Sequence, residues 1–197
     1  MTTTPMWSLR YDPVEHRYWL EDRELISVTT ALKEARFLDD RWFSDEASER
    51  GTYVHQACDL LDDDNLASYL PQVNGYIAAY QKFLHEAQPD WRLREHQVCD
   101  ATLGYAGTLD RAGYLNGRWV LVDIKTGGPA PWHGLQLAAY GRLTPSPDTG
   151  ARPARFDLYL TERGTYALIP QTDRTDEAEF FHALGTAQFR RRHGFCA

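Results

Sequence analysis

The 197-residue chain has few cysteines and no paired cysteine motif. Its three cysteines, Cys58, Cys99 and Cys196, lie far apart, and no C-x-x-C occurs. A zinc ribbon, a thioredoxin-type redox site and a locally spaced iron–sulfur cluster all need closer cysteines, so we expect none of them. So few cysteines in a chain of this size also argue against a disulfide framework and favour reduced, intracellular thiols.

Long apolar runs are absent as well. The longest ones contain a handful of residues, whereas a membrane-spanning helix needs about 20. The first ten residues lack the basic and apolar regions of a signal peptide. The sequence has no internal repeat and no low-complexity tract. We therefore expect a soluble, cytoplasmic protein that does not bind a membrane.

The chain has no overall excess of basic residues. Its net charge is −7, from 21 Lys and Arg against 28 Asp and Glu. This balance argues at first against nucleic acid, because phosphate binding relies on Lys and Arg. The acidity belongs to the first half, since residues 1–98 carry 10 basic and 18 acidic groups while residues 99–197 carry 11 and 10. Nucleic acid therefore stays open as a partner.

Apolar periodicity and turn residues predict an α/β domain with a central mixed β-sheet flanked by helices, and an N-terminal β-hairpin extension. The expected strands are three short ones within 7–28, then 92–101, 104–115, 117–126, 156–160 and 166–169. The expected helices are 27–37, 44–61, one between Pro71 and Pro89, 132–143 and 173–191. No linker is long enough to divide the chain. We expect one domain with N-terminal strands and a short helix (1–40), a core (41–145) and a C-terminal hairpin and helix (146–197).

The strands around residue 116 gather chemically active side chains. Asn116-Gly117 is a strong two-residue hairpin signal. An antiparallel hairpin turning there pairs residues whose numbers sum to about 233, which places Asp110 opposite Asp123 with Cβ atoms about 5 Å apart. Lys125 lies on the same face as Asp123 because strand side chains repeat every two residues. The hairpin is therefore predicted to carry two acids and a lysine on one face.

Such a set points to a metal-dependent hydrolase. Adjacent carboxylates repel, especially when buried, and a divalent cation relieves that repulsion. Hard oxygen ligands suit Mg²⁺ or Mn²⁺. A lysine beside the cation can orient and deprotonate a bound water, or stabilise negative charge on phosphorus. These are the parts needed to hydrolyse a phosphodiester.

With two flanking motifs, the set resembles the PD-(D/E)XK nuclease superfamily, in particular its RecB-like and phage-exonuclease branch. The resemblance spans residues 45–145 and follows the branch's order: Gly51-Thr-Tyr-Val-His55, Gly107-Thr-Leu-Asp110, Asp123-Ile-Lys125 and Gln136-Leu-Ala-Ala-Tyr140. It implies a restriction-endonuclease-like core. The cysteines that hold an iron–sulfur cluster in some relatives are absent, and so are helicase motifs.

The resemblance also implies roles for individual residues. His55, Asp110 and Asp123 would be metal ligands together with the backbone carbonyl of Ile124, and Lys125 would be the catalytic lysine. Gln136 would orient Lys125 or the water, and Tyr140 would contact the scissile phosphate or brace the site. The implied protein is a Mg²⁺- or Mn²⁺-dependent deoxyribonuclease with one or two ions. It would act on single- or double-stranded DNA ends in recombination, repair or phage DNA processing, in a prokaryotic cell or a phage-infected host, alone or with an annealing partner protein.

Several alternatives stay open at this point. An exonuclease is favoured over a structure-specific endonuclease on the same fold, and over a non-catalytic DNA-binding module. Glu95 and Asp59 are either further acids near the metal or structural residues. The acidic run Asp62-Asp63-Asp64 is expected to be a solvated helix end. Most tyrosines and tryptophans are expected in the core, whereas one near the site could stack on an unpaired base, the candidates being Trp42, Trp132 or Tyr105.

Overall fold

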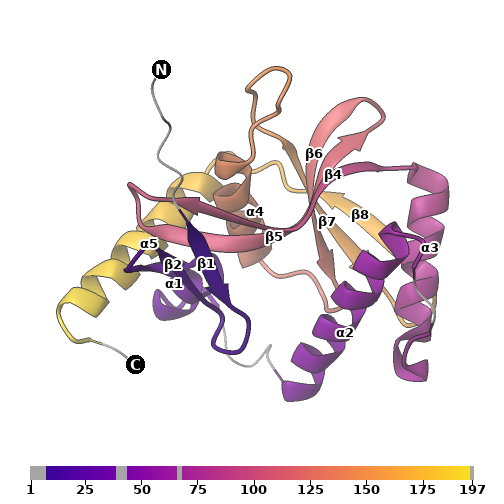
Figure 1. Cartoon of the computed structure of the whole chain (residues 1–197), viewed down its shortest axis with the longest axis horizontal. Helices are drawn as coiled ribbons and strands as arrows, with labels where there is room; N and C mark the ends of the chain where they lie inside the picture. Colours follow the sequence, from indigo (N-terminus) through magenta and orange to yellow (C-terminus); the bar gives the residue numbers. More distant parts are fainter. Residues whose placement is uncertain (1–7, 39–43, 66–67, 196–197) are drawn as a thin grey trace.

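The structure is a computed structural model and describes residues 8–38, 44–65 and 68–195 (Figure 1). The strands are β1 (Leu9–Asp12), β2 (Arg17–Leu20), β3 (Arg23–Ser27), β4 (Asp90–Asp100), β5 (Tyr105–Leu115), β6 (Arg118–Lys125), β7 (Ala154–Leu160) and β8 (Tyr166–Pro170). The helices are α1 (Val28–Glu34), α2 (Asp45–Asp62), α3 (Asn74–Ala87), α4 (Trp132–Leu143) and α5 (Asp176–Arg192), with a 3₁₀ turn over Pro71–Val73. The expected α/β class, mixed sheet and flanking helices are confirmed. Among the described residues, no helix has the length and apolar character to cross a membrane.

The strands form one open, eight-stranded sheet in the order β1-β2-β3-β5-β6-β7-β8, with β4 paired to β5. β3 runs parallel to β5, and β6 runs parallel to β7. The pairs β4–β5, β5–β6 and β7–β8 are antiparallel. The β5–β6 register runs from Arg111 opposite Val122 to Leu115 opposite Arg118, so the sum of 233 expected from the Asn116-Gly117 turn is confirmed.

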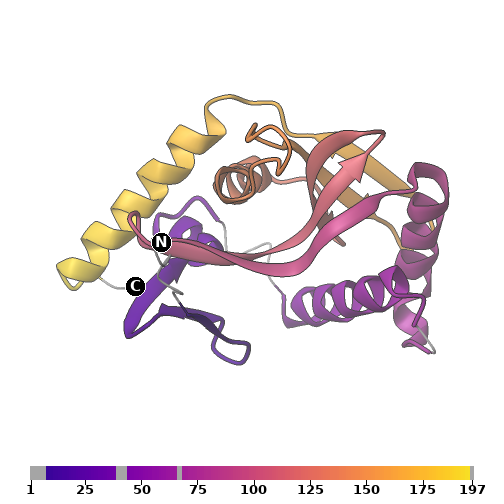
Figure 2. The same cartoon turned by 45° about the horizontal axis from the view of Figure 1, so that its top comes forward.

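Helices cover both faces of the sheet (Figures 1 and 2). One core forms where α1, α4 and α5 pack on one face, and it includes Trp119 and Leu121 of β6. The second core forms under α2 and α3, and it includes Val120, Val122 and Ile124. Alternate residues of β6 therefore enter opposite cores, so this strand is covered on both faces.

The edge of β5 that faces β6 is only partly paired, and this leaves room for a site. Near its start, β5 pairs with β3 through Tyr105 and Ala106, and further on it pairs with β6 from Arg111. Between these two ladders lie residues 107–110. β6 leaves β5 after Val122 and continues along β7 as far as Lys125. The motif residues at 107–110 and 123–125 therefore border the place where two neighbouring strands diverge.

Candidate functional site

Asp110 closes the gap where β6 leaves β5. The backbone amide of Ile124 has no β5 carbonyl opposite it, and instead it donates to the Asp110 carboxylate at 2.6 Å. The Asp110 side chain is buried, and burial raises the pKa of this carboxyl, with the charge of His55 opposing the rise. A strand-end amide therefore fixes the direction of one predicted metal ligand.

His55 reaches the same point from helix α2. Its Nε2–H donates to the carbonyl of Ile124 at 3.0 Å, and its Nδ1 lies 3.5 Å from Asp110 Oδ1 and 3.8 Å from Glu95 Oε1. Every group around the ring is an acceptor, so the arrangement favours an imidazolium with both nitrogens protonated. Burial lowers the pKa of His55, but the charges of Asp110 and Glu95 outweigh it and raise the pKa to about 9.

Glu95 completes the cluster from β4. It lies opposite Asp110 between the paired residues Arg94–Arg111 and His96–Leu109, and its φ of 42° is in the left-handed region that non-glycine residues seldom adopt. Burial raises the pKa of Glu95, but the hydrogen bond and the charge of His55 together lower it by more than burial raises it. The net shift of the Glu95 pKa is therefore downward.

The three side chains of this cluster suit a hard divalent cation. One ligand atom each from His55, Glu95 and Asp110 lies within 4.8 Å of the others. Two carboxylates and an imidazole are donors that Mg²⁺ and especially Mn²⁺ accept. The Ile124 carbonyl lies beside the same imidazole. Asp123, which was predicted as a metal ligand, does not belong to this group. The group contains Glu95 in its place.

Asp123 is paired with the predicted catalytic lysine. Lys125 Nζ lies 2.6 Å from Asp123 Oδ2 and donates to Gln136 Oε1 of α4 at 2.8 Å. The ion pair places Asp123 and Lys125 on one face, as the period of the strand predicts. Burial and the charge of Asp110 raise the pKa of Asp123 to about 6, against the opposing effect of Lys125. Lys125 also lies 5.0 Å from the ring centroid of Trp132.

Tyr140 packs under this group because position 107 has no side chain. Tyr140 and Gln136 lie one turn apart on α4 and are both buried. A Cβ atom on Gly107 would lie 2.5 Å from Tyr140 Cε1, closer than any real contact. Burial raises the pKa of Tyr140 well above its usual value, so the phenol stays neutral.

A hollow of about 270 Å³ opens over these residues and is lined by His55, Asp110, Asp123, Lys125 and Gln136. The structure therefore brings all the motif side chains to one place except Tyr140, which lines an adjoining hollow together with Asp110 and Gln136.

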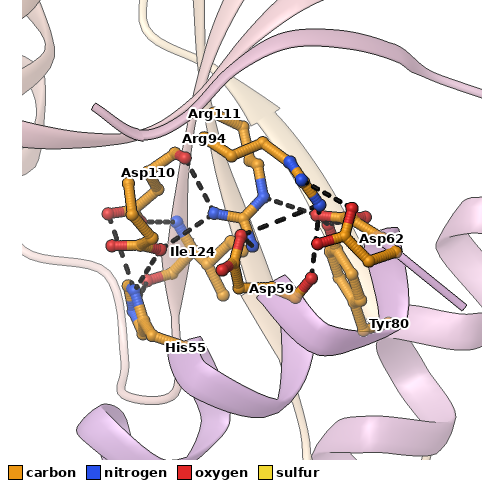
Figure 3. A network of polar contacts seen from close by, with 10 residues as sticks. His55, Asp59, Asp62, Tyr80, Arg94, Asp110, Arg111 and Ile124 are labelled. Carbon is orange, nitrogen blue, oxygen red and sulfur yellow. Dashed lines mark hydrogen bonds and ion pairs between the residues drawn. The ribbon is translucent and has the colours of Figure 1, made fainter. Parts of the chain in front are cut away.

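A buried arginine joins the cluster to helix α2 (Figure 3). Arg111 is wholly buried and donates to Glu95 at 2.8 Å, to the backbone carbonyl of Asp110 at 2.7 Å and to Asp62 at 2.7 Å. The Tyr80 hydroxyl donates to the same Asp62 carboxylate. Neither Arg111 nor its pairing was predicted, because nothing in the local pattern distinguishes it from a surface arginine.

Two expectations about acidic residues are settled by this network. The prediction that Asp62 is solvated is wrong, because its side chain is only 3% exposed and pairs with Arg111. Asp59 does not belong to the His55–Glu95–Asp110 cluster. It lies 3.8 Å from Arg111 and 3.9 Å from Arg94, where it contributes to the same charge network (Figure 3).

The three predicted stacking aromatics have different outcomes. Tyr105 is fully buried against Phe180, and its hydroxyl donates to the carbonyl of Ala139, so the prediction that it stacks on a base is wrong. Trp132 is partly buried and lines the hollow above Lys125. Trp42 lies outside the described residues.

Comparison with known proteins adds no assignment to this geometry. No protein-family model matches the chain, and a search of curated protein sequences finds no significant match. The chemistry of the site therefore rests on the positions and charges of its own side chains.

Proposed function

We propose that this protein is a metal-dependent deoxyribonuclease, with a restriction-endonuclease-like core, that removes nucleotides from DNA ends. The observation that carries the proposal is the position of Lys125. Its ammonium group is held by Asp123 at 2.6 Å and Gln136 at 2.8 Å, beside the His55–Glu95–Asp110 cluster and at the wall of an open hollow. A lysine fixed next to a cluster of cation ligands supplies two contributions to phosphodiester hydrolysis, stabilisation of developing negative charge and a site for a water-activating cation.

The protein side chains divide the work. His55, Glu95 and Asp110 would hold Mg²⁺ or Mn²⁺, with the Ile124 carbonyl as a further oxygen ligand. A divalent ion held there would supply Lewis-acid polarisation of a phosphoryl oxygen and would acidify a water molecule. His55 must give up a proton to become a ligand, because a protonated nitrogen has no lone pair to offer.

Lys125 acts on the substrate from the α4 side. Its ammonium can donate to a phosphate oxygen as negative charge develops there. The bonds to Asp123 and Gln136 hold Nζ in one position, so little reorganisation is needed during the reaction. Tyr140, packed on Gly107, supports the floor of the site from below.

The test uses end-labelled single- and double-stranded oligonucleotides with Mg²⁺ or Mn²⁺. Lys125→Ala should lower cleavage by about 10²- to 10⁴-fold, the range that a positioned proton-transfer or charge-stabilising group contributes. Asp123→Ala should lower it as well, because Lys125 then loses its ion pair. Lys82→Ala is the matched control, since Lys82 lies on α3 and pairs only with Glu86 among the described residues. Cleavage by Lys125→Ala at the wild-type rate contradicts the proposal.

A circular single-stranded substrate separates the two nuclease classes. An exonuclease needs an end and leaves the circle intact, whereas a structure-specific endonuclease opens it. We expect linear DNA to be shortened progressively and the circle to persist under the same conditions. Calorimetry with Mn²⁺ tests the third alternative, because a non-catalytic DNA-binding module has no need for the ion.

A further inference from the structure

The N-terminal hairpin forms a wall beside the His55–Glu95–Asp110 cluster. Two hollows of about 500 and 510 Å³ adjoin the cluster, and both are lined by Tyr11 and His16 of the hairpin and by Glu95 of the cluster. The first also reaches Asp110, and the second also reaches His55 on α2. In Figure 2 the hairpin of β1 and β2 and the helix α2 lie on the same side of the long β4–β5 ribbon. A cleft therefore runs between the hairpin and α2, with the cluster at its floor.

The aromatic wall of this cleft, formed by Tyr11 and His16, is held against β5 through Tyr18. Tyr11 and Tyr18 are cross-strand partners, with ring centroids 4.7 Å apart and planes inclined at 25°. Tyr18 is buried, and its hydroxyl is hydrogen-bonded to Thr108 at 2.8 Å, two residues before Asp110. The Tyr11 hydroxyl is hydrogen-bonded to His16 Nδ1 at 2.8 Å. These contacts hold the Tyr11 ring in place before any ligand arrives, which lowers the cost of binding.

The charge of the cleft favours a base on this wall over a phosphate. Among the described residues, no lysine or arginine lines either hollow, whereas Asp59, Glu95 and Asp110 do. A phosphate placed there would meet the carboxylates of Asp59, Glu95 and Asp110 and no lysine or arginine among the described lining residues. A nucleobase has no net charge, and it can stack on an aromatic ring whatever its sequence. The wall therefore offers a stacking contact to an uncharged base, whereas the acidic side chains of the floor offer no favourable contact to a phosphate.

We propose that Tyr11 and His16 form a stacking subsite for one unpaired nucleobase next to the scissile phosphate, so that the substrate is single-stranded DNA. The inference rests on the proposed nuclease function and deepens it. A pair inside a duplex has both faces covered by its neighbours, so stacking one of its bases on a protein ring requires a single strand or costs unpairing energy. Lys125 and Trp132 line a different hollow from Tyr11 and His16, so the subsite makes a contact separate from theirs.

The first test is binding of a fluorescein-labelled 12-nucleotide oligothymidylate with Mn²⁺, followed by anisotropy in a Lys125→Ala background that cuts it about 10²- to 10⁴-fold more slowly. Tyr11→Leu retains apolar packing on Tyr18 but removes the aromatic face. It should weaken binding between about 5-fold and about 150-fold, the range of one base–aromatic stack. Tyr11→Phe retains the ring and should stay within about 2-fold of the background protein. Tyr69→Ala removes a tyrosine that is 41% exposed and lines neither hollow, and it should leave binding unchanged.

The second test separates this subsite from the nuclease function itself. Methyl p-nitrophenyl phosphate is a phosphodiester without a nucleobase, so Tyr11→Leu should hydrolyse it at the wild-type rate while its KM for single-stranded DNA rises. If wild-type protein cuts neither the diester nor DNA, the nuclease function fails, and the oligothymidylate binding series still decides the subsite. If wild-type protein is active and Tyr11→Leu binds and cuts single strands equally well, the subsite is wrong and the function stands. Equal losses on both substrates, or faster cleavage of blunt duplex than of single strands, also overturn the subsite.

Discussion

Replacing Arg111 by methionine should destabilise the protein strongly, because the Arg111 guanidinium pairs with the buried Asp62 carboxylate. Arg111 is fully buried and bonds to Asp62, Glu95 and the carbonyl of Asp110 at 2.7–2.8 Å. Methionine fills similar space without charge. It would leave Asp62, only 3% exposed, with the Tyr80 hydroxyl as its remaining strong partner. The buried carboxylate then bears most of its desolvation cost alone.

The size of the loss follows from that unpaired charge. Breaking a buried ion pair by removing one partner costs about 3–5 kcal/mol. In a chain of this length, 1 kcal/mol shifts the melting temperature by about 2–4 °C, so we expect a fall of about 6–20 °C. Arg94→Met is the matched control. Arg94 is 29% exposed and pairs with Asp63, which is 55% exposed, and such a pair contributes at most about 1 kcal/mol.

The assay is urea unfolding followed by tryptophan fluorescence, with Asp62→Asn as the second arm. Asparagine removes the charge and can still accept the hydrogen bond from Tyr80, so the double variant should recover about 2 kcal/mol or more relative to Arg111→Met alone. Burial raises the pKa of Asp62 while Arg111 lowers it. The loss in Arg111→Met should therefore be smaller at pH 5 than at pH 8. Stability within 1 kcal/mol of wild type for Arg111→Met, or strictly additive losses in the double variant, would refute the reasoning.

Three further predictions concern the site and its surroundings. Gly107→Ala should cost about 1–3 kcal/mol and lower DNA cleavage, because its Cβ would lie 2.5 Å from Tyr140 Cε1. Adding Tyr140→Ala should recover part of the melting temperature, and no recovery would locate the strain elsewhere. In metal-free protein the pKa of His55 is raised from 6.5 to about 9. This shift contributes at most about 3 kcal/mol to the free energy of unfolding. The contribution is fully present below pH 6.5 and is lost as the pH rises through 9. Melting curves should show this decline in wild type and not in His55→Gln, and equal slopes would contradict it. Burial and the charge of Asp123 raise the pKa of Asp157 from 3.8 to about 6. Asp157→Asn should therefore stabilise the protein by about 1–3 kcal/mol at pH 8 and change little at pH 4, and a loss of stability at pH 8 would show that the charge is needed.

Much of the fold could be predicted because its signals are local. Asn116-Gly117 sets the register of β5 and β6, since both residues adopt positive φ values and close a two-residue turn. Ser27 and Ser44 cap α1 and α2 by accepting from backbone amides three residues ahead. The nearly continuous apolar run of β6 is also a local signal, since a strand covered on both faces is apolar at successive positions.

The candidate site could be predicted where one strand carries it and not where several elements meet. Asp123 and Lys125 share a face because strand side chains alternate, and their 2.6 Å contact agrees with that placement. Glu95 was left undecided between a metal and a structural role, because its direction depends on a left-handed backbone within β4 and on Arg111. Asp62 looked like part of a solvated acidic run. It became a buried partner of an arginine 49 residues further along the chain.

The sequence by itself determined the order of helices and strands, the hairpin register and the membership of the Asp110, Asp123 and Lys125 set, since each depends on contacts within a few residues or on strand periodicity. Only the tertiary structure decided which acids surround His55, which arginine holds them and which aromatic wall faces them. Those contacts join α2, β4, β5 and the N-terminal hairpin, and their geometry depends on how the helices and the diverging strands pack. Packing over long sequence separations leaves no periodic trace in a single sequence.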